Sequence, residues 1–106
     1  MSVRHVKLSI VRGGGLAGVA RRTELASDAL PEDAARALEA HASAVVAVAA
    51  SGPPPRSPDE MLYEVCVERP DGTTTARYTD ATLPEEVRAL IAWADGRPER
   101  TDALEG

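Results

Sequence analysis

A glycine-rich stretch near the N-terminus carries the pattern most readily connected with chemistry. The residues from Val6 to Arg22 read VKLSIVRGGGLAGVARR, in which Gly13, Gly15 and Gly18 reproduce the G-x-G-x-x-G fingerprint of dinucleotide-binding domains. In such domains the glycines follow a buried strand and open a helix whose N-terminal N–H groups bind the pyrophosphate. The flanking elements therefore decide whether nucleotide binding fits.

The segments on either side of these glycines do not fit a dinucleotide site. After them, Val19, Thr23 and Leu25 recur with the period of two that is typical of a strand, where a nucleotide site needs a helix. Before them, apolar and polar residues alternate from Val6 to Val11, whereas the buried parallel strand of such a domain is continuously apolar. A chain of 106 residues is also too short for the two halves that bind a full dinucleotide. We therefore expect no nucleotide cofactor.

The glycines also fit the end of a β-hairpin. Gly13, Gly14 and Gly15 admit backbone conformations with positive φ, which a tight connection between two strands often requires. Gly18 would then mark a bulge or a close approach of another backbone. The hairpin end is either a mobile turn or a protruding loop that meets a partner, with Leu16 as its apolar tip.

Metal-binding and nucleophilic residues are too sparse to form a catalytic set. His5 and His41 lie on different elements, and no Cys or His stands at the spacing of zinc ligands. Cys66 is the single cysteine, and Glu64 and Glu68 flank it on one strand face with no evident base. We expect a protein with no metal, no cofactor and no enzymatic activity.

The other polar clusters have structural explanations. The acidic pairs Glu32–Asp33 and Glu85–Glu86 belong to first helical turns, where they complement the helix dipole. Arg21–Arg22 is expected to be a solvated strand edge, with a partner contact as the alternative. His41 is expected on the surface of a helix, and Trp93 is expected to pack at the end of the second helix.

Composition and charge narrow the classes of partner and compartment. The chain is 43% apolar and 27% charged, as is usual for a soluble globular domain. A formal net charge of −5 argues against nucleic acid, and no apolar run approaches the length of a membrane span. The N-terminal segment lacks the plan of a signal peptide, and a lone cysteine suits a reducing compartment. We expect a cytoplasmic protein, with a monomer favoured.

Periodicity predicts two strand pairs, each followed by a helix. Leu30-Pro-Glu and Leu83-Pro-Glu both open a helix after a hairpin, which predicts a ββα-ββα pseudo-repeat. Such hairpins can pair edge to edge in a four-stranded antiparallel sheet with two helices packed on one face, an α+β fold. Residues 1–98 form this single domain, and the polar tail 99–106 is expected to be disordered. The expected strands span residues 6–11, 16–25, 61–69 and 73–79, and the helices begin at Pro31 and Pro84 and end before Gly52 and Gly96.

Several of these features together resemble the emfourin family. The most specific is Arg12-Gly-Gly-Gly-Leu-Ala-Gly18, and the likeness extends over residues 3–95. It also includes the Leu-Pro-Glu helix start at 30–32, the strand Tyr63-x-Val65-x-Val67, the Asp71-Gly72 turn, and the Leu83-Pro84 helix that ends near Trp93.

The resemblance implies a small cytoplasmic protein inhibitor of protealysin and other thermolysin-like metallopeptidases, with such a peptidase as its partner. Family members often carry aromatic residues at the loop and at the end of the first helix, where this chain has Leu16 and Val45-Val46. This departure bears on potency and on the choice of target.

The leading hypothesis is therefore a non-enzymatic inhibitor that blocks the active-site cleft of a thermolysin-like zinc metallopeptidase with a loop. Gly13, Gly14, Gly15 and Leu16 are the predicted partner-binding residues. The proline-rich residues 52–58 are the competing loop, because prolines stiffen a segment. The alternative from another class is a binding or assembly module whose sheet edge pairs with a partner strand.

Overall fold

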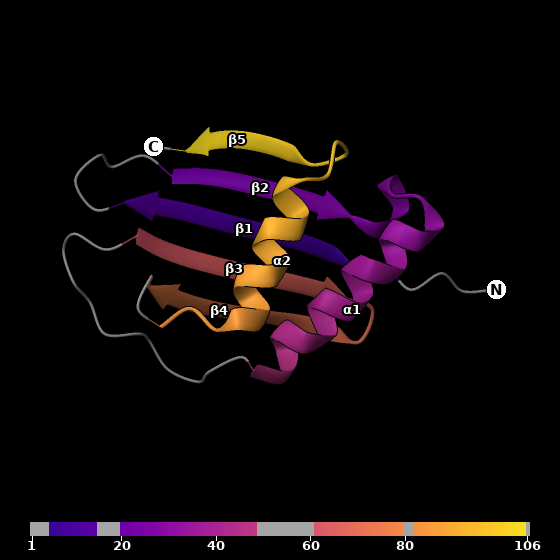
Figure 1. Ribbon diagram of the computed structural model, residues 1–106, viewed down its shortest axis with the longest axis horizontal. Helices are drawn as coiled ribbons and strands as arrows, with labels where there is room; N and C mark the ends of the chain where they lie inside the picture. Colours follow the sequence, from indigo (N-terminus) through magenta and orange to yellow (C-terminus); the bar gives the residue numbers. More distant parts are fainter. Residues whose placement is uncertain (1–4, 15–19, 49–60, 80–81, 106) are drawn as a thin grey trace.

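A five-stranded antiparallel sheet with two helices on one face forms the fold, as shown by a computed structural model that describes residues 5–14, 20–48, 61–79 and 82–105 (Figure 1). The α+β class and the two helices confirm the sequence prediction. The elements are β1 (Lys7–Gly14), β2 (Ala20–Ala26), the 3-10 turn η1 (Ser27–Ala29), α1 (Glu32–Val48), β3 (Met61–Arg69), β4 (Gly72–Thr79), α2 (Glu85–Asp95) and β5 (Thr101–Glu105).

The sheet has the strand order β4-β3-β1-β2-β5, and every neighbouring pair is antiparallel. The two predicted hairpins meet edge to edge, with β1 beside β3. The prediction of four strands is wrong, because Thr101–Glu105, within the tail expected to be disordered, pairs with the outer edge of β2. That edge offers unpaired backbone N–H and C=O groups, and the fifth strand satisfies them. The pseudo-repeat itself stays a prediction.

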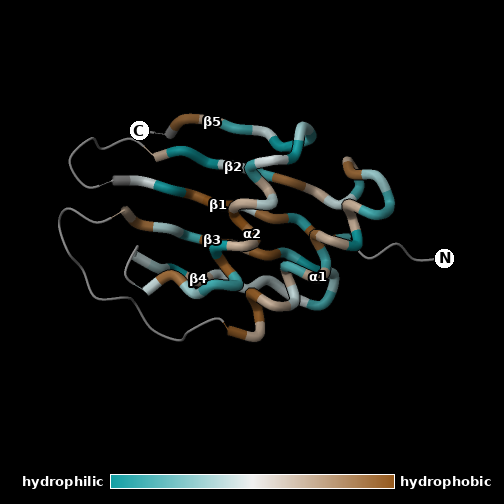
Figure 2. The backbone as a smooth tube through the Cα atoms, viewed as in Figure 1, coloured by the Kyte–Doolittle hydropathy of each residue, from teal (hydrophilic) through white to brown (hydrophobic). Residues whose placement is uncertain are grey.

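Strict alternation along the central strands places apolar side chains on the helix-covered face. Leu8 lies between Leu25 of β2 and Val67 of β3, and all three are buried. Ile10 and Val65 form the next layer. Figure 2 shows these hydrophobic stretches in brown in the middle of the sheet. Val65 and Val67 of β3 are buried on this face, while Glu64 and Glu68, which share a strand face with Cys66, point to the other side.

Both helices bury the apolar stripe that their sequences predict. α1 begins directly after Pro31 and α2 directly after Pro84, and each carries two acidic residues in its first turn. Burying one Leu or Ile side chain stabilises a fold by about 1.5–3 kcal/mol. The buried positions are Ala34, Leu38, Ala42 and Val45 on α1 and Val87, Leu90, Ile91 and Ala94 on α2.

Tight connections close the elements where the sequence predicts turns. β3 ends at Arg69 and β4 begins at Gly72, whose φ of 155° is a value that side-chain-bearing residues rarely adopt. Gly96 follows the last residue of α2, and its N–H donates to the carbonyl oxygen of Trp93. In the parts of the chain that the structure describes, no helix is long and apolar enough to cross a membrane.

Candidate functional site

Gly13 and Gly14, the first two predicted partner-binding residues, are the last residues of β1. Gly13 lies opposite Ala20 of β2 and opposite Leu62 of β3, so it is held between two strands. Gly14 lies opposite Met61. Gly15 and Leu16, the other two predicted residues, lie outside the described residues. The hairpin connection was expected to begin at Gly13, but it begins after Gly14, because neighbouring strands pair with Gly13 and Gly14.

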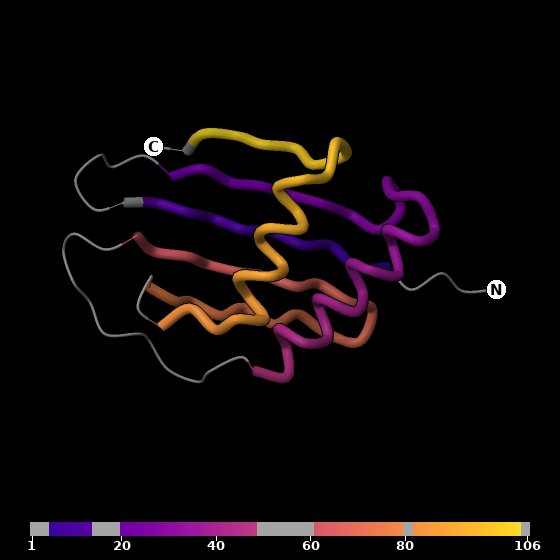
Figure 3. The backbone as a smooth tube through the Cα atoms, viewed as in Figure 1, coloured from indigo at the N-terminus to yellow at the C-terminus, as the bar shows by residue number. Residues whose placement is uncertain are grey.

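The described strand ends next to the two competing loops lie opposite one another. Residues 52–58 lie outside the described residues, but β3 begins at Met61, directly opposite Gly14. In Figure 3, β1 finishes and β3 starts at the same, left-hand end of the sheet. We call this region the loop end, defined by Gly13, Gly14, Ala20, Met61 and Leu62.

Two large apolar side chains are exposed near this end of the sheet, on the separate strands β3 and β5 and on opposite faces. Among the described residues these are Leu62, which is 48% exposed, and Leu104, which is 77% exposed. Leu62 lies opposite Gly13, and Leu104 lies opposite Arg21, one position further along the sheet. The two side chains do not form one patch, and single exposed apolar residues of this kind are common on protein surfaces.

The glycine motif lacks the structure that a dinucleotide site requires. The element that follows it is the strand β2, antiparallel to β1, where a pyrophosphate site would have a helix N-terminus. β1 also lacks the continuously apolar sequence of a buried parallel strand, since Lys7 and Ser9 alternate with buried Val6, Leu8 and Ile10. The expectation of a strand after the glycines is confirmed.

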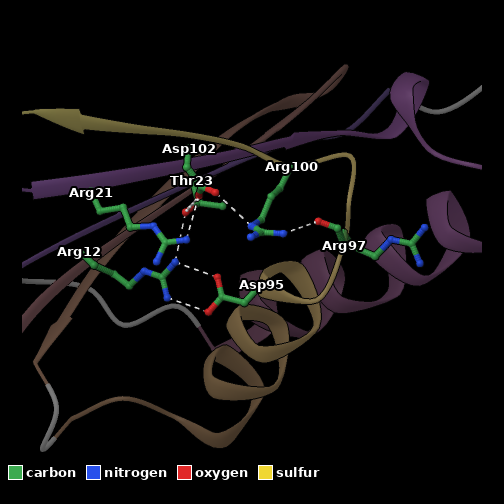
Figure 4. A network of polar contacts seen from close by, with 7 residues as sticks. All are labelled: Arg12, Arg21, Thr23, Asp95, Arg97, Arg100 and Asp102. Carbon is green, nitrogen blue, oxygen red and sulfur yellow. Dashed lines mark hydrogen bonds and ion pairs between the residues drawn. The ribbon is translucent and has the colours of Figure 1, made fainter.

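A network of charged side chains adjoins the loop end, and it starts at Arg12, the residue before Gly13. The Arg12 guanidinium donates two parallel hydrogen bonds to the carboxylate of Asp95, at 2.9 Å and 2.8 Å (Figure 4). The Arg12 side chain is only 14% exposed, whereas that of Asp95 is 37% exposed. Asp95 is the last residue of α2, so this bidentate pair joins β1 to the C-terminal end of that helix.

The network continues across β2 to the C-terminal strand. Arg12 donates to the hydroxyl oxygen of Thr23 at 3.1 Å, and that hydroxyl donates to Asp102 of β5 at 2.8 Å. Arg21 contacts Asp102 at 3.1 Å, and Arg100 contacts its other carboxylate oxygen at 3.1 Å. Asp102 therefore binds two cations and a hydroxyl, and two of these partners, Thr23 and Arg21, tie β5 to β2 (Figure 4).

These contacts shift the pKa values of the groups that form them. The hydrogen bonds from Arg12 lower the pKa of Asp95 below its ordinary value of 3.8. The hydrogen bond from Thr23, followed by that from Arg21, lowers the pKa of Asp102 in the same direction. The pKa of Arg12 is raised, chiefly by its hydrogen bonds to Asp95. Both carboxylates are therefore ionised at neutral pH, and the network is a set of ion pairs.

The expected strand edge at Arg21–Arg22 is wrong, because β5 pairs with that side of β2, whereas the expected solvent exposure is confirmed for Arg21. Sequence reasoning also missed Arg12, Asp95 and Asp102. For Arg12 and for Asp95, the sequence does contain a feature that indicates an unusual role. Arg12 continues the helix-facing alternation of Leu8 and Ile10, and Asp95 stands at a helix C-terminus, where the dipole disfavours an anion. Asp102 gave no comparable signal.

His41 and Trp93 form a ring contact between the two helices. Their centroids are 5.3 Å apart, and the Arg97 guanidinium lies 5.9 Å from the Trp93 ring centroid. Trp93 is partly buried and packs against the core, which confirms its predicted place at the end of the second helix. His41 is half-buried in this contact, which is a correction to the expected free surface position. The ring of Trp93 accounts for the difference, because it covers one side of the imidazole.

The remaining candidates for chemistry stay apart from one another. Cys66 is a free, half-buried cysteine opposite Ser9 and Thr75, on the sheet face away from the helices. His5 is exposed. Within residues 5–14, 20–48, 61–79 and 82–105, no three His, Cys, Asp or Glu side chains are grouped so as to hold a metal ion.

Comparison with known proteins gives one family and one solved structure. The family model of Emfourin matches residues 10–95. The chain is similar to emfourin (M4in) from Serratia proteamaculans, an M4 family peptidase inhibitor, with 16% sequence identity and a TM-score of 0.48. That similarity covers 87% of this chain and 88% of the other. A comparison with curated protein sequences gave no match.

Proposed function

The chain belongs to the Emfourin family, and we propose on this basis that it is a protein inhibitor of a thermolysin-like zinc metallopeptidase. The observation that carries the proposal is the extent of the family match, because residues 10–95 include both candidate loops and all elements from β2 to α2. The inhibitor is a binding protein and not an enzyme. Its partner supplies the zinc.

Inhibition would take place at the loop end. A thermolysin-like peptidase accepts an extended chain in a cleft where zinc polarises the scissile carbonyl. Gly13 and Gly14 are anchored by β2 and β3, so the predicted contact residues Gly15 and Leu16 follow directly from a paired strand. A contact segment with fixed ends loses less conformational freedom on binding than a free peptide does. Leu62 supplies exposed apolar surface beside it.

A titration of peptidase activity tests the proposal. Purified chain is added to several thermolysin-like peptidases, and hydrolysis of a short peptide substrate is followed. The proposal predicts that hydrolysis falls with increasing chain concentration for at least one enzyme. It also predicts that a small zinc-binding inhibitor of the cleft competes with the chain. Full activity of every enzyme at micromolar chain would contradict the proposal.

Charged substitutions in the first loop test which loop makes the contact. Gly14→Asp and Leu16→Asp place a carboxylate where an apolar cleft is expected, so inhibition should be lost while the circular dichroism spectrum is unchanged. Inhibition that survives both changes would move the contact to residues 52–58.

A second candidate function is a module that binds a partner strand along a sheet edge. One observation favours it: β4 is an outer strand of eight residues with one neighbour, β3, among the described strands. Its residues contain neither Lys nor Pro, which often protect such edges. In the titration above, this candidate predicts no effect on any peptidase.

A further inference from the structure

Arg12 is a charged residue at a position where strand alternation calls for an apolar one. Val6, Leu8 and Ile10 precede it on the helix-facing side of β1 and are buried. A guanidinium in such a place loses hydration, and this cost is offset only by close pairing. Its Nε has no hydrogen-bond partner among the described residues, so the pairing rests on the two terminal nitrogens.

Asp95 is equally unexpected for local reasons. The C-terminal end of a helix carries a partial negative charge, which an aspartate opposes. The pairing with Arg12 explains the residue type, since two parallel hydrogen bonds fix both the distance and the direction between β1 and α2.

The network also reaches a part of the chain beyond the family match. That match ends at residue 95, whereas Arg100 and Asp102 belong to the following segment. Through Asp102, β5 is attached to Thr23 and Arg21, so the start of β2 is held from one side by β1 and from the other by β5. The strand positions next to this network are Gly13 and Ala20.

We propose that Arg12, Asp95 and Asp102 are positioning residues that fix the end of β1 and the start of β2 for binding the peptidase. This inference rests on the proposed function. Glycines allow many backbone directions, so a rigid anchor directly before Gly13 restricts the direction in which the chain leaves the sheet. The restriction lowers the ordering cost of binding, and β5 contributes to it through the contacts of Asp102 with Thr23 and Arg21.

The test uses Arg12→Met, Asp95→Asn and Asp102→Asn in the full chain. Two matched controls accompany them. Glu32→Gln removes an exposed ion pair with Arg36 on α1, and Ile91→Val removes one buried methylene from the core one helical turn before Asp95 while it leaves every charged group of the network in place. Inhibition constants are measured well below the melting temperature of every variant, so that each protein is folded.

The expected result is an inhibition constant raised about tenfold by each network variant, which corresponds to about 1.4 kcal/mol of binding free energy. Both controls should leave the constant unchanged, although Ile91→Val lowers the melting temperature. If the network only stabilises the fold, the network variants should keep the wild-type inhibition constant, as Ile91→Val does. That result would overturn the proposal.

Amide hydrogen exchange provides a readout that does not depend on inhibition. The amides of Gly13, Gly14 and Arg21 should exchange faster in Asp95→Asn than in Ile91→Val. If the wild-type chain inhibits no peptidase, the proposed function fails, while faster exchange at these amides still supports the anchor. Equal exchange in the two variants would overturn the positioning role whatever the inhibition titration shows.

Discussion

The two halves of β1 are stabilised in opposite ways. The half from Lys7 to Ile10 lies under the helices, and its buried residues Leu8 and Ile10 pack among apolar neighbours such as Leu25 and Val67. The half from Arg12 to Gly14 is held by ion pairs and by strand pairing, and it leads to the predicted contact residues. Figure 2 shows the corresponding change along β1 from brown to teal and white.

This contrast separates stability from binding. Apolar contacts are strong and tolerant of direction, so the first half secures the fold. Bidentate ion pairs are directional, so the second half fixes the orientation of a backbone that glycines leave free. A change in one half should therefore affect mainly unfolding, and a change in the other mainly inhibition.

Leu8→Ala should give the largest effect on the free energy of unfolding. Leu8 is fully buried, and its truncation leaves a cavity that costs about 2–5 kcal/mol. Chemical denaturation measures this cost. At a temperature where the variant is folded, its inhibition constant should stay close to that of the wild type. A large rise of the constant would contradict the proposed separation of stability and binding between the two halves of β1.

Asp95→Asn should have a smaller effect on unfolding. It removes the charge-assisted character of two hydrogen bonds to Arg12, and we expect a loss of about 1–2 kcal/mol because Asp95 is partly exposed. The same denaturation experiment measures the loss. A loss as large as that of Leu8→Ala would show that the ion pair belongs to the core.

The loss of folding stability at acid pH should depend on Asp95 and Asp102. The folded-state pKa values of Asp95 and Asp102 are lowered, so their contribution is complete above the ordinary pKa of 3.8 and is lost as the pH falls through the lower folded values. Wild-type stability should fall more steeply below about pH 4 than that of Asp95→Asn. Parallel curves for the two proteins would contradict the role of the pair.

Glu32→Gln should give the smallest effect. Glu32 and Arg36 form an ion pair whose two side chains are about four-fifths exposed, at 82% and 78%. Such pairs contribute about 0.5 kcal/mol or less. A melting temperature and an inhibition constant that both match the wild type are expected. A clear change in either quantity would mean that exposed charges in general, and not the network beside the loop end in particular, determine stability and inhibition.

Local periodicity predicts most of the fold. Alternation in Tyr63-x-Val65-x-Val67 defines both the strand and its buried face, and the spacing of Val87, Leu90, Ile91 and Ala94 does the same for α2. These signals depend only on neighbouring residues, so one sequence suffices to read them.

Long-range pairing explains what the sequence does not reveal. Thr101–Glu105 has no apolar periodicity that would predict a strand. It pairs with the open edge of β2, where Asp102 contacts Thr23 and Arg21. Arg12 and Asp95 lie far apart in the sequence, so no local pattern predicts their contact. Of the predicted partner-binding residues, Gly13 and Gly14 are now placed in a strand beside Met61, which the glycine pattern alone did not indicate.

The most direct test of the account is amide hydrogen exchange of the chain, free and bound to a thermolysin-like peptidase that it inhibits. The account predicts slower exchange in the complex at Gly13, Gly14, Met61 and Leu62, with the edge strand β4 unchanged. Slower exchange along Thr73 to Thr79, with no change at the loop end, would contradict it and would identify the sheet edge as the binding surface.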